Sequence, residues 1–496
     1  MESIWRETSV KPDLDMSLGK PDGRSINEGQ PQSILNTDAI VIGGGMAGIL
    51  TAWMLESKGV RTTVLEADTV GSGQTGGTTA KVTAQHDLIY DRLMDTVGRE
   101  LAGQYAHANA AAIDSYRELI DTLHISCDWE DSDAYLYSTG ESAVLQREAD
   151  AARELGLPAE YTQQTDLPFT VAGAVRFRGQ GHFHPLKFLY ALAASLRIYE
   201  HTPVLKVEGN EVITDRGRFH GEHIIFATHY PFMNRPGYYF MRMHQERSYA
   251  LAVRGARLLN GMYLSVDHGG LSFRNYEDML IIGGGSHRTG ENTGGGQYEL
   301  LRRWAREFWP GCTEAACWSA QDCMTLDHIP YIGHFSQKYP NWYVATGFKK
   351  WGMTSAMVSA QLISDAIVGK DNPDRHVFSP QRRTWAASSK NFIKDGWQST
   401  RHLTRYYLTR PGQDIQELAA GHGGIVKYDG HKVGAYRDED GSLYVVSVRC
   451  PHLGCQLEWN PEEKSWDCPC HGSRYDHTGR LLNNPAQKED IRHEKD

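Results

Sequence analysis

The sequence predicts an α/β fold interleaved with an antiparallel sheet, followed by a small all-β domain. Three observations lead to this fold class. Residues 38–65 read as strand, helix and strand, as in a βαβ unit. Residues 202–282 contain repeated short strand-like runs, which favour an antiparallel sheet. Four of the eight cysteines fall between Cys450 and Cys470, which marks the C-terminal segment as a separate unit with its own chemistry.

Length and composition narrow the functional classes. The chain has 496 residues, which corresponds to about three domains. Its net charge of −10 argues against nucleic acid as a partner, because phosphate binding needs clustered basic residues. No uninterrupted apolar run is long enough to span a membrane. Residues 1–30 lack the apolar core of a signal peptide, so we expect a cytoplasmic protein.

A glycine-rich loop follows the first predicted strand. The pattern G-x-G-x-x-G joins the strand at 38–42 to the helix at 46–58. In such a loop Gly43 permits the tight turn, Gly45 lets the backbone approach a pyrophosphate, and Gly48 lets helix and strand pack closely. Glu66 ends the next strand and is placed to accept hydrogen bonds from ribose hydroxyls. The sequence therefore predicts a dinucleotide site.

Two further loops favour FAD over NAD. Residues 71–80 are rich in Gly, Ser and Thr, and supply hydrogen-bond donors for a long cofactor. Residues 345–354 repeat the strand–glycine–helix arrangement, and the N-terminus of that helix could face the negative charge of a reduced flavin.

Together these motifs resemble the D-amino-acid oxidase/glycine oxidase superfamily of flavoenzymes over residues 37–372. The resemblance implies FAD-binding parts at about 37–90, 180–230 and 320–372, and substrate-domain parts at about 91–179 and 231–319. It also implies that FAD is bound by Gly43, Gly45, Met46, Ala47, Gly48, Glu66, Ala67, Gly73, Thr78, Thr79, Ala80, Val204, Thr228, Gly347, Lys350, Gly352, Met353 and Thr354.

Catalytic candidates come from the same resemblance. Lys350 stands where glycine oxidases have an arginine that binds the substrate carboxylate, although Lys is a less geometric carboxylate ligand. Lys349 and Lys350 could equally be solvated surface lysines. His244 and Tyr249 are further candidates for the substrate face.

The C-terminal cysteines form a second motif with two histidines. Cys450 and His452 make C-x-H, and Cys468 and His471 make C-x-x-H fifteen residues further on. Such loops can hold two metals, with both thiolates on one iron and both imidazoles on the other. A Cys₂His₂ zinc site is the alternative, but it leaves Cys455 and Cys470 unexplained.

Residues 413–490 resemble Rieske [2Fe–2S] domains. The resemblance implies a disulfide between Cys455 and Cys470, and hydroxyl groups of Ser473 and Tyr475 that donate to the cluster sulfur atoms. A ring-hydroxylating oxygenase would also need a mononuclear iron with two histidines and a carboxylate, for which the nearest group is Asp327, His328 and His334.

The remaining segments connect these units. We expect an extended arm at 1–36, a basic connector at 373–411 and the Rieske domain at 412–496. Within 374–410 there are eight basic residues against two acidic ones, so the connector could dock the acidic Rieske domain, recruit an acidic carrier, or form a solvated surface.

A flavin and a one-electron cluster together make a converter from two-electron to one-electron transfer. The combination resembles a bacterial family of FAD-dependent oxidoreductases with a C-terminal Rieske domain, which share the run 78–81 and Gln85–His86. The hypothesis is oxidation of an amine or amino-acid-like small molecule, with electrons passed to a ferredoxin- or cytochrome-type carrier or to O₂. Two alternatives are electron entry through the cluster, and an electron-transfer module for a partner enzyme.

Overall fold

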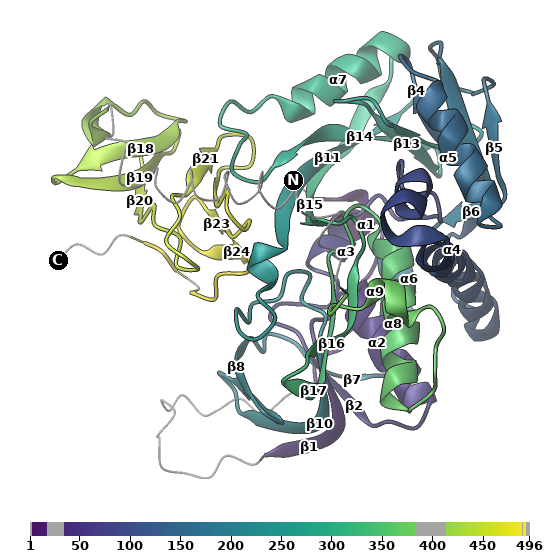
Figure 1. Cartoon of the computed structure of the whole chain (residues 1–496). Coiled ribbons are helices and arrows are strands. Elements are labelled where there is room, and N and C mark those ends of the chain that lie inside the picture. The colour runs from purple at the N-terminus through teal and green to yellow at the C-terminus, as the bar shows by residue number, and fades with distance from the viewer. Residues whose placement is uncertain (1, 17–33, 383–412, 489, 493–496) are drawn as a thin grey trace.

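The computed structural model describes residues 2–16, 34–382, 413–488 and 490–492. Most of the predicted basic connector, from residue 383 onward, and residues 17–33 of the predicted arm therefore lie outside the described residues. The described chain forms a large two-sheet part and a smaller C-terminal β part beside it (Figure 1).

The first sheet contains the predicted βαβ unit. Its strand order is β16-β17-β10-β1-β2-β7, with parallel pairing from β17 to β7. β1 lies in the middle because residues 39–42 are apolar and fully buried. β8 and β9 form a hairpin that joins β10. The bounds are β1 (Leu35–Ile42), β2 (Thr62–Leu65), β7 (Arg197–Tyr199), β8 (Val204–Glu208), β9 (Glu211–Thr214), β10 (Arg218–Phe226), β16 (Tyr331–Ser336) and β17 (Tyr339–Thr346).

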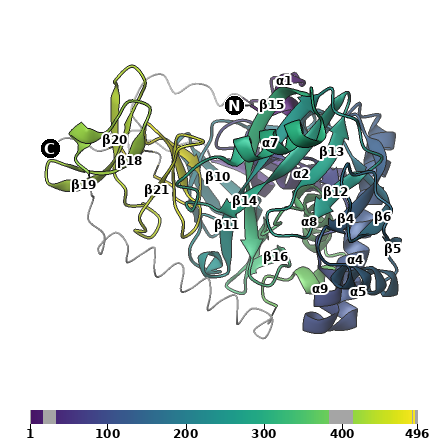
Figure 2. The same cartoon turned by 90° about the horizontal axis from the view of Figure 1, so that it is seen from above.

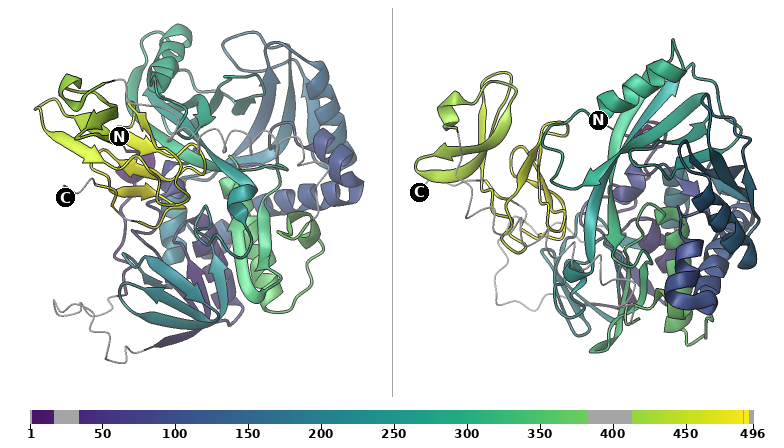
Figure 3. Two further views of the ribbon diagram at one scale, coloured as in Figure 1. Left: turned by 60° about the vertical axis from the view of Figure 1, so that its left-hand side comes forward. Right: turned by 45° about the horizontal axis from the view of Figure 1, so that its top comes forward.

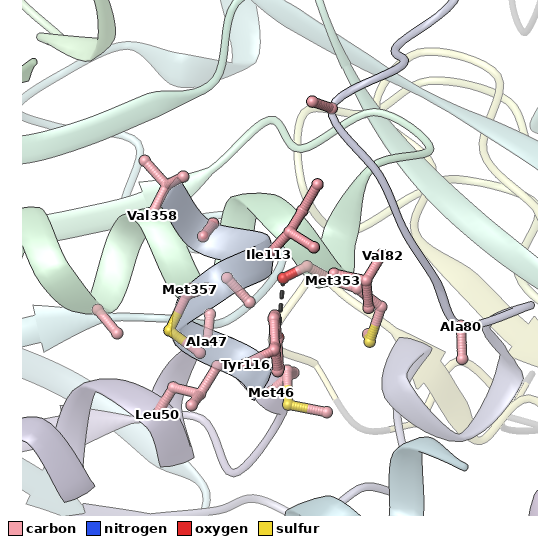
Figure 4. Packing of buried hydrophobic residues seen from close by; sticks show 14 of the residues in the cluster. Met46, Ala47, Leu50, Ala80, Val82, Ile113, Tyr116, Met353, Met357 and Val358 are labelled. Atoms are coloured by element: carbon pink, nitrogen blue, oxygen red, sulfur yellow. Dashed lines mark hydrogen bonds between the residues drawn. The ribbon is translucent and has the colours of Figure 1, made fainter. Parts of the chain in front are cut away.

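Helices pack on this sheet through an apolar core that Figure 4 shows in part. α2 (Met46–Ser57) packs against α8 (Gly352–Ile367), and α8 also packs against α4 (Tyr90–Leu123), whose Tyr116 hydroxyl donates to the Met353 carbonyl at 2.9 Å. The packing of α2 against α8 therefore joins the helix after the first glycine loop to the helix after the last one. The other helices are α1 (Ile4–Glu7), α3 (Gln74–Gly77), α5 (Ala143–Glu154), α6 (Pro185–Ala193), α7 (Gln297–Phe308), α9 (Arg375–Phe378), and the 3₁₀ turns η1 (Tyr239–Met241) and η2 (Ile415–Glu417).

The second sheet has the strand order β15-β11-β14-β13-β12-β4-β6-β3, with β5 on β6. It is antiparallel except between β12 and β4, which run parallel. The sequence predicted an antiparallel sheet, and this one parallel pair is possible because a long crossover, which contains β5 to β11, connects β4 to β12. The bounds are β3 (Lys81–Val82), β4 (Glu130–Ser138), β5 (Ala159–Thr162), β6 (Gly173–His182), β11 (Met243–Arg254), β12 (Met262–Ser265), β13 (Ser272–Tyr276), β14 (Met279–Arg288) and β15 (Thr313–Thr325).

The C-terminal part contains two small antiparallel sheets. The four-stranded sheet lies next to β11 and β14, and the three-stranded sheet lies farther out (Figures 1 and 2). Figure 3 shows the same order from two other directions. The strands are β18 (Gly423–Tyr428), β19 (His431–Arg437), β20 (Leu443–Val446), β21 (Glu458–Asn460), β22 (Ser465–Asp467), β23 (Arg474–Asp476) and β24 (Leu481–Asn483).

Residues 2–16 pack into the large part, although the sequence predicted an extended arm here. The Trp5 side chain is fully buried, and its indole N–H donates to the Thr78 carbonyl at 2.6 Å. The Arg274 guanidinium lies 5.1 Å from the Trp5 ring centroid. The N-terminal segment therefore supports the second glycine-rich loop. Within the described ranges, no helix is long and apolar enough to cross a membrane.

Candidate active site and metal centre

The first glycine loop has no room for side chains at two positions. A Cβ atom on Gly48 would lie 1.9 Å from the Gly43 carbonyl oxygen, and one on Gly43 would lie 2.5 Å from the Ala227 carbonyl oxygen. At Gly45 the nearest atom would be the Thr75 hydroxyl oxygen at 3.4 Å. The loop is thus packed against main chain at Gly43 and Gly48, and has more space at Gly45, where a pyrophosphate would approach the backbone.

Glu66 lies beside this loop. Its carboxylate accepts hydrogen bonds from the main-chain N–H groups of Gly44 at 2.6 Å and Asp68 at 2.9 Å. Burial raises the pKa of Glu66 in spite of these two bonds. Glu66 and the next residue, Ala67, are both predicted to contact FAD. The bond from Gly44 places them beside the loop that precedes α2.

The other predicted FAD loops meet the first one. The Thr75 hydroxyl accepts a hydrogen bond from the Met46 N–H at 3.0 Å. The Thr354 hydroxyl donates to the Thr83 carbonyl at 2.9 Å, which ties the start of α8 to the chain just after Ala80. The bonds between Thr83 and Thr354 link these two loops. The predicted FAD residues of the loops are Gly73, Thr78, Thr79 and Ala80 around α3, and Gly347, Gly352, Met353 and Thr354 before and at the start of α8.

Thr228 lies beside the first glycine loop, because a Cβ atom on Gly43 would be 3.4 Å from its main-chain nitrogen, whereas Val204 begins β8; both residues also contact the C-terminal part. The carbonyl oxygens of Val204 and Thr228 accept hydrogen bonds at 3.3 Å from Gln487 and Asn484, respectively. Two residues predicted for FAD thus also contact the predicted Rieske domain.

Lys350 lies in a group of acidic side chains. Its ammonium donates to Ser286 Oγ at 2.8 Å and to Asp322 Oδ2 at 3.4 Å, and it pairs with Glu246 Oε2 at 3.8 Å. Burial alone would lower the pKa of Lys350, but the charges of Asp322 and Glu246 raise it. Lys350 is therefore a paired cation rather than one that is open to a substrate carboxylate.

Glu246 joins His244 to the same group. The His244 Nε2 atom lies 3.5 Å from Glu246 Oε1. Burial alone would raise the pKa of Glu246, but the hydrogen bond with His244 and the charge of Lys350 hold it at about 2. Glu246 and Asp322 stand opposite each other on β11 and β15, so their carboxylates face the same side of the sheet.

Lys349 occupies a different setting from Lys350. Its backbone is left-handed, with φ 52°, and its N–H donates to the Cys323 carbonyl at 2.9 Å. Burial lowers the pKa of Lys349 to about 8. Lys349 is half-buried, whereas Lys350 is exposed but has its ammonium paired with Asp322 and Glu246.

Tyr249 lies on the opposite face of β11 from Lys350 and His244. It is fully buried, and its hydroxyl is 3.1 Å from His287 Nε2. Side chains alternate along a strand, so His244, Glu246 and Ser248 face one side, while Gln245, Arg247 and Tyr249 face the other. The structure therefore brings together two of the three catalytic candidates.

The possible mononuclear-iron group is engaged in other contacts. Both carboxylate oxygens of Asp327 accept hydrogen bonds from Arg382 at 2.8 Å. His334 Nδ1 is bonded to the Pro340 carbonyl at 2.8 Å. These contacts occupy the carboxylate of Asp327 and one nitrogen of His334, whereas the Nδ1 atom of His328 is buried without a hydrogen-bond partner among the described residues.

The four predicted cluster ligands form a thiol pair and an imidazole pair. The Cys450 thiol is hydrogen-bonded to that of Cys468, which raises the pKa of Cys450 and lowers that of Cys468. The ring centroids of His452 and His471 are 4.8 Å apart. Burial lowers the pKa of His452 to about 4 and that of His471 to about 3, so both rings are neutral, as metal ligands must be.

The Nδ1 atoms of both histidines are buried and have no hydrogen-bond partner among the described residues. An unpartnered buried nitrogen is costly unless it binds something. In the part of the chain that the structure describes, no three of the four ligands gather closely enough to hold a single ion. Two metals, one for each pair, fit this arrangement, whereas one zinc ion does not.

Cys455 and Cys470 form a disulfide with a Cα–Cα distance of 6.6 Å. Their sulfur atoms and that of Cys468 lie within 4.8 Å of one another, so the disulfide borders the metal centre. Ser473 hydrogen-bonds to the Cys450 sulfur and accepts a bond from the Ala486 N–H at 3.0 Å. The buried Tyr475 hydroxyl donates to the Lys488 carbonyl at 3.3 Å.

The second ligand loop is bonded to β11 and β15. Gln245 Nε2 donates to the His471 carbonyl at 2.7 Å, and Gln321 Nε2 donates to the Gly472 carbonyl at 2.8 Å. A Cβ atom on Gly472 would lie 2.6 Å from the Gln245 Cβ atom, so glycine permits this close approach. On another strand, Arg288 Nε donates to the Pro469 carbonyl at 2.8 Å.

A buried group of charges fixes the same contact. Arg247 of β11 binds Glu463 at 2.5 Å, and Glu463 also binds Arg474. Arg474 Nε pairs with Asp467 at 2.9 Å. The side chains of Arg247 and Glu463 are only 3% and 8% exposed, so water cannot replace their bonds easily.

Comparison with known families decides the chain's identity. The family model described as "FAD dependent oxidoreductase" matches residues 38–366. The chain belongs to this family. The model described as "Rieske [2Fe-2S] domain" matches residues 411–493. This FAD dependent oxidoreductase therefore has two cofactors, FAD and a Rieske cluster.

Known proteins resemble this oxidoreductase in whole or in part. A Bacillus subtilis (strain 168) protein, named as a Rieske 2Fe-2S iron-sulfur protein, YhfW, is 39% identical over 91% of this chain and 92% of its own length. Cytochrome b6-f complex iron-sulfur subunit 1 of Cyanophora paradoxa is 32% identical over 25% of this chain and 50% of its own. Glycine oxidase from Geobacillus kaustophilus has the same fold, with a TM-score of 0.61 and 20% identity over 70% of this chain and 99% of its own.

Replacing one cluster thiol tests the assignment of the metal centre in this oxidoreductase. We expect Cys468→Ser to abolish the electron paramagnetic resonance (EPR) signal of the reduced Rieske cluster, because a serine hydroxyl does not replace a thiolate on iron. Iron content should fall and FAD content should stay unchanged. Cys127→Ser, at a buried thiol away from the metal centre, is the control. A cluster signal that survives in Cys468→Ser would contradict the ligand assignment.

Proposed function

We propose that the protein oxidises an amine or amino-acid-like substrate by hydride transfer to FAD, and that the electrons leave singly through the Rieske cluster to an external carrier. One observation supports this most directly. Successive residues of β11 reach both sites, with His244 and Glu246 on the Lys350 side and Gln245 and Arg247 on the cluster side. The strand pair β11–β15 is thus common to both sites.

Bound FAD would supply hydride acceptance, and the cluster would supply one-electron transfer. The chain's own residues would prepare the substrate. Glu246 is ionised at neutral pH because its pKa is about 2, so it can pair with a substrate amine. Lys350 limits the repulsion between the carboxylates of Glu246 and Asp322, which the pairing of β11 with β15 places on one side of the sheet.

The stoichiometry follows from the two electron steps. One C–H bond of the substrate amine breaks, and its proton and two electrons leave together as hydride, so that the substrate becomes an iminium. The two electrons then reduce two one-electron carriers in turn, and the proton is released to solvent. A ferredoxin- or cytochrome-type protein is the proposed carrier, with O₂ as the alternative acceptor. We also propose a cytoplasmic location, which cell fractionation would test.

Anaerobic titration of the purified holoprotein tests this proposal. Amines and amino acids are added without oxygen, while flavin absorbance and the EPR signal of the reduced cluster are followed. We expect flavin bleaching first and the cluster signal second. In Cys468→Ser the flavin should still bleach, but no electrons should reach the carrier. If only a reduced ferredoxin-type protein reduces the two centres, electrons enter through the cluster and the proposed direction is wrong.

A further inference from the structure

Both cluster histidines are held by residues from outside the Rieske domain. His452 Nε2 lies 2.7 Å from Asn234 Oδ1. The ring of His471 is hydrogen-bonded to the main chain of Phe240. Asn234 and Phe240 lie between β10 and β11, so one segment of the oxidoreductase part contacts both imidazoles.

The hydrogen bond of Asn234 determines which nitrogen of His452 carries the proton. A neutral imidazole has one N–H donor and one acceptor nitrogen. Because Asn234 Oδ1 is an acceptor, the proton lies on Nε2, and the lone pair is on Nδ1. The Nδ1 atom is the buried one that lacks a partner among the described residues, so this tautomer leaves the correct atom for iron.

The Phe240 ring covers the gap between the two imidazoles. Its centroid is 6.2 Å from that of His452 and 5.8 Å from that of His471, with edge-to-face geometry in both cases. His471 is only 6% exposed. The outward edge of the histidine pair is therefore packed against the oxidoreductase part.

We infer that Asn234 is a positioning residue of the metal centre, supplied by the oxidoreductase part of the chain. It fixes the His452 ring and raises the electron density that this ligand gives to iron. A hydrogen-bond acceptor on the outer nitrogen makes an imidazole more basic, which favours the oxidised metal. The cluster's tendency to accept an electron thus depends on docking to the oxidoreductase part. The inference needs only the cluster, and it is independent of the direction of electron flow proposed above.

EPR-monitored redox titration of full-length holoprotein tests this inference. Asn234→Leu removes the acceptor, and Asn234→Asp keeps it and adds charge. The redox equilibrium shifts by the difference in the strength of this hydrogen bond between the two oxidation states, and loss of a whole neutral bond, about a fivefold factor, is its upper limit. At the native midpoint we expect the ratio of reduced to oxidised cluster to rise by up to about fivefold in Asn234→Leu and to fall in Asn234→Asp. Pulsed EPR should show an altered nitrogen coupling for one histidine ligand only.

Gln487→Ala is the matched control, because Gln487 also bonds across this interface but touches neither imidazole. Its titration curve should match that of the native chain. If the leucine and aspartate variants titrate like the native protein, or if both shift in the same direction, the inference is overturned. If the titration curve of Gln487→Ala shifts in the same way as those of the Asn234 variants, the shift reflects a general loosening of the interface, and the inference is overturned as well.

Discussion

Gly48→Val should weaken FAD binding by about 100-fold and leave the Rieske cluster intact. The Cβ atom of any side chain at residue 48 would lie 1.9 Å from the Gly43 carbonyl oxygen, so α2 would have to move away from the pyrophosphate cradle. Overpacking costs about 1–3 kcal/mol even where side chains can yield, and here the obstacle is main chain. We expect FAD affinity to fall by about 100-fold, as measured by flavin content after gel filtration and by titration with added FAD.

The control for this variant adds a methyl group where space is open. A Cβ atom on Gly103, inside α4, would meet nothing within 4 Å. Gly103→Ala should retain full flavin content, since alanine favours a helix. The EPR signal of the cluster should be unchanged in both variants. Stoichiometric FAD in Gly48→Val would show that the cofactor does not bind at this loop.

Glu463→Ala should weaken the attachment of the Rieske domain more than any exposed substitution. It leaves the buried guanidinium groups of Arg247 and Arg474 without their shared carboxylate. Removing one partner of a buried ion pair costs about 3–5 kcal/mol. The loss should appear as a lower midpoint of denaturant unfolding and as slower reduction of the cluster by substrate.

The pH dependence of this effect has a definite sign. Burial alone would raise the pKa of Glu463, but the charges of Arg247 and Arg474 hold it at about 2, below the usual 4.5. The ion pair therefore stabilises the fold fully above about pH 4.5, and its contribution is lost as the pH falls toward 2. The difference in unfolding free energy between the native chain and Glu463→Ala should shrink over that interval.

Glu299→Ala is the comparison for Glu463→Ala. Its ion pair with Arg306 is about 60% exposed on both sides, so its loss should cost less than about 1 kcal/mol. Equal destabilisation by the two variants would contradict the role assigned to the buried pair.

The sequence predicted those parts of the sites that depend on local spacing. The glycine motif spans only the turn after β1 and the first turn of α2, and the ligand loops with Cys450 and Cys468 each lie between neighbouring strands. Their geometry follows from neighbouring residues, and no distant contact is needed to recognise them. The comparisons confirm both cofactors that these motifs indicated.

The residues that the sequence did not reveal are those placed by long-range pairing. Asp322 reaches Glu246 only because β15 pairs with β11, and Asn234 reaches His452 across 218 residues of chain. Alternation along β11 could have indicated part of this pattern, since His244 and Tyr249 stand at odd separation and must face opposite sides. The paired state of Lys350 could not be predicted, because its partners come from three different strands.

The alternation along β11 also restricts how this chain can evolve. Deletion of one residue from the strand would reverse the direction of every side chain beyond that point. Gln245 and Arg247 would then turn toward the substrate side, while His244 and Glu246 would turn toward the cluster. Point substitutions can alter either site separately, but a change in the length of β11 damages both at once. Related chains that keep both cofactors should therefore vary in their loops and conserve the length of this strand.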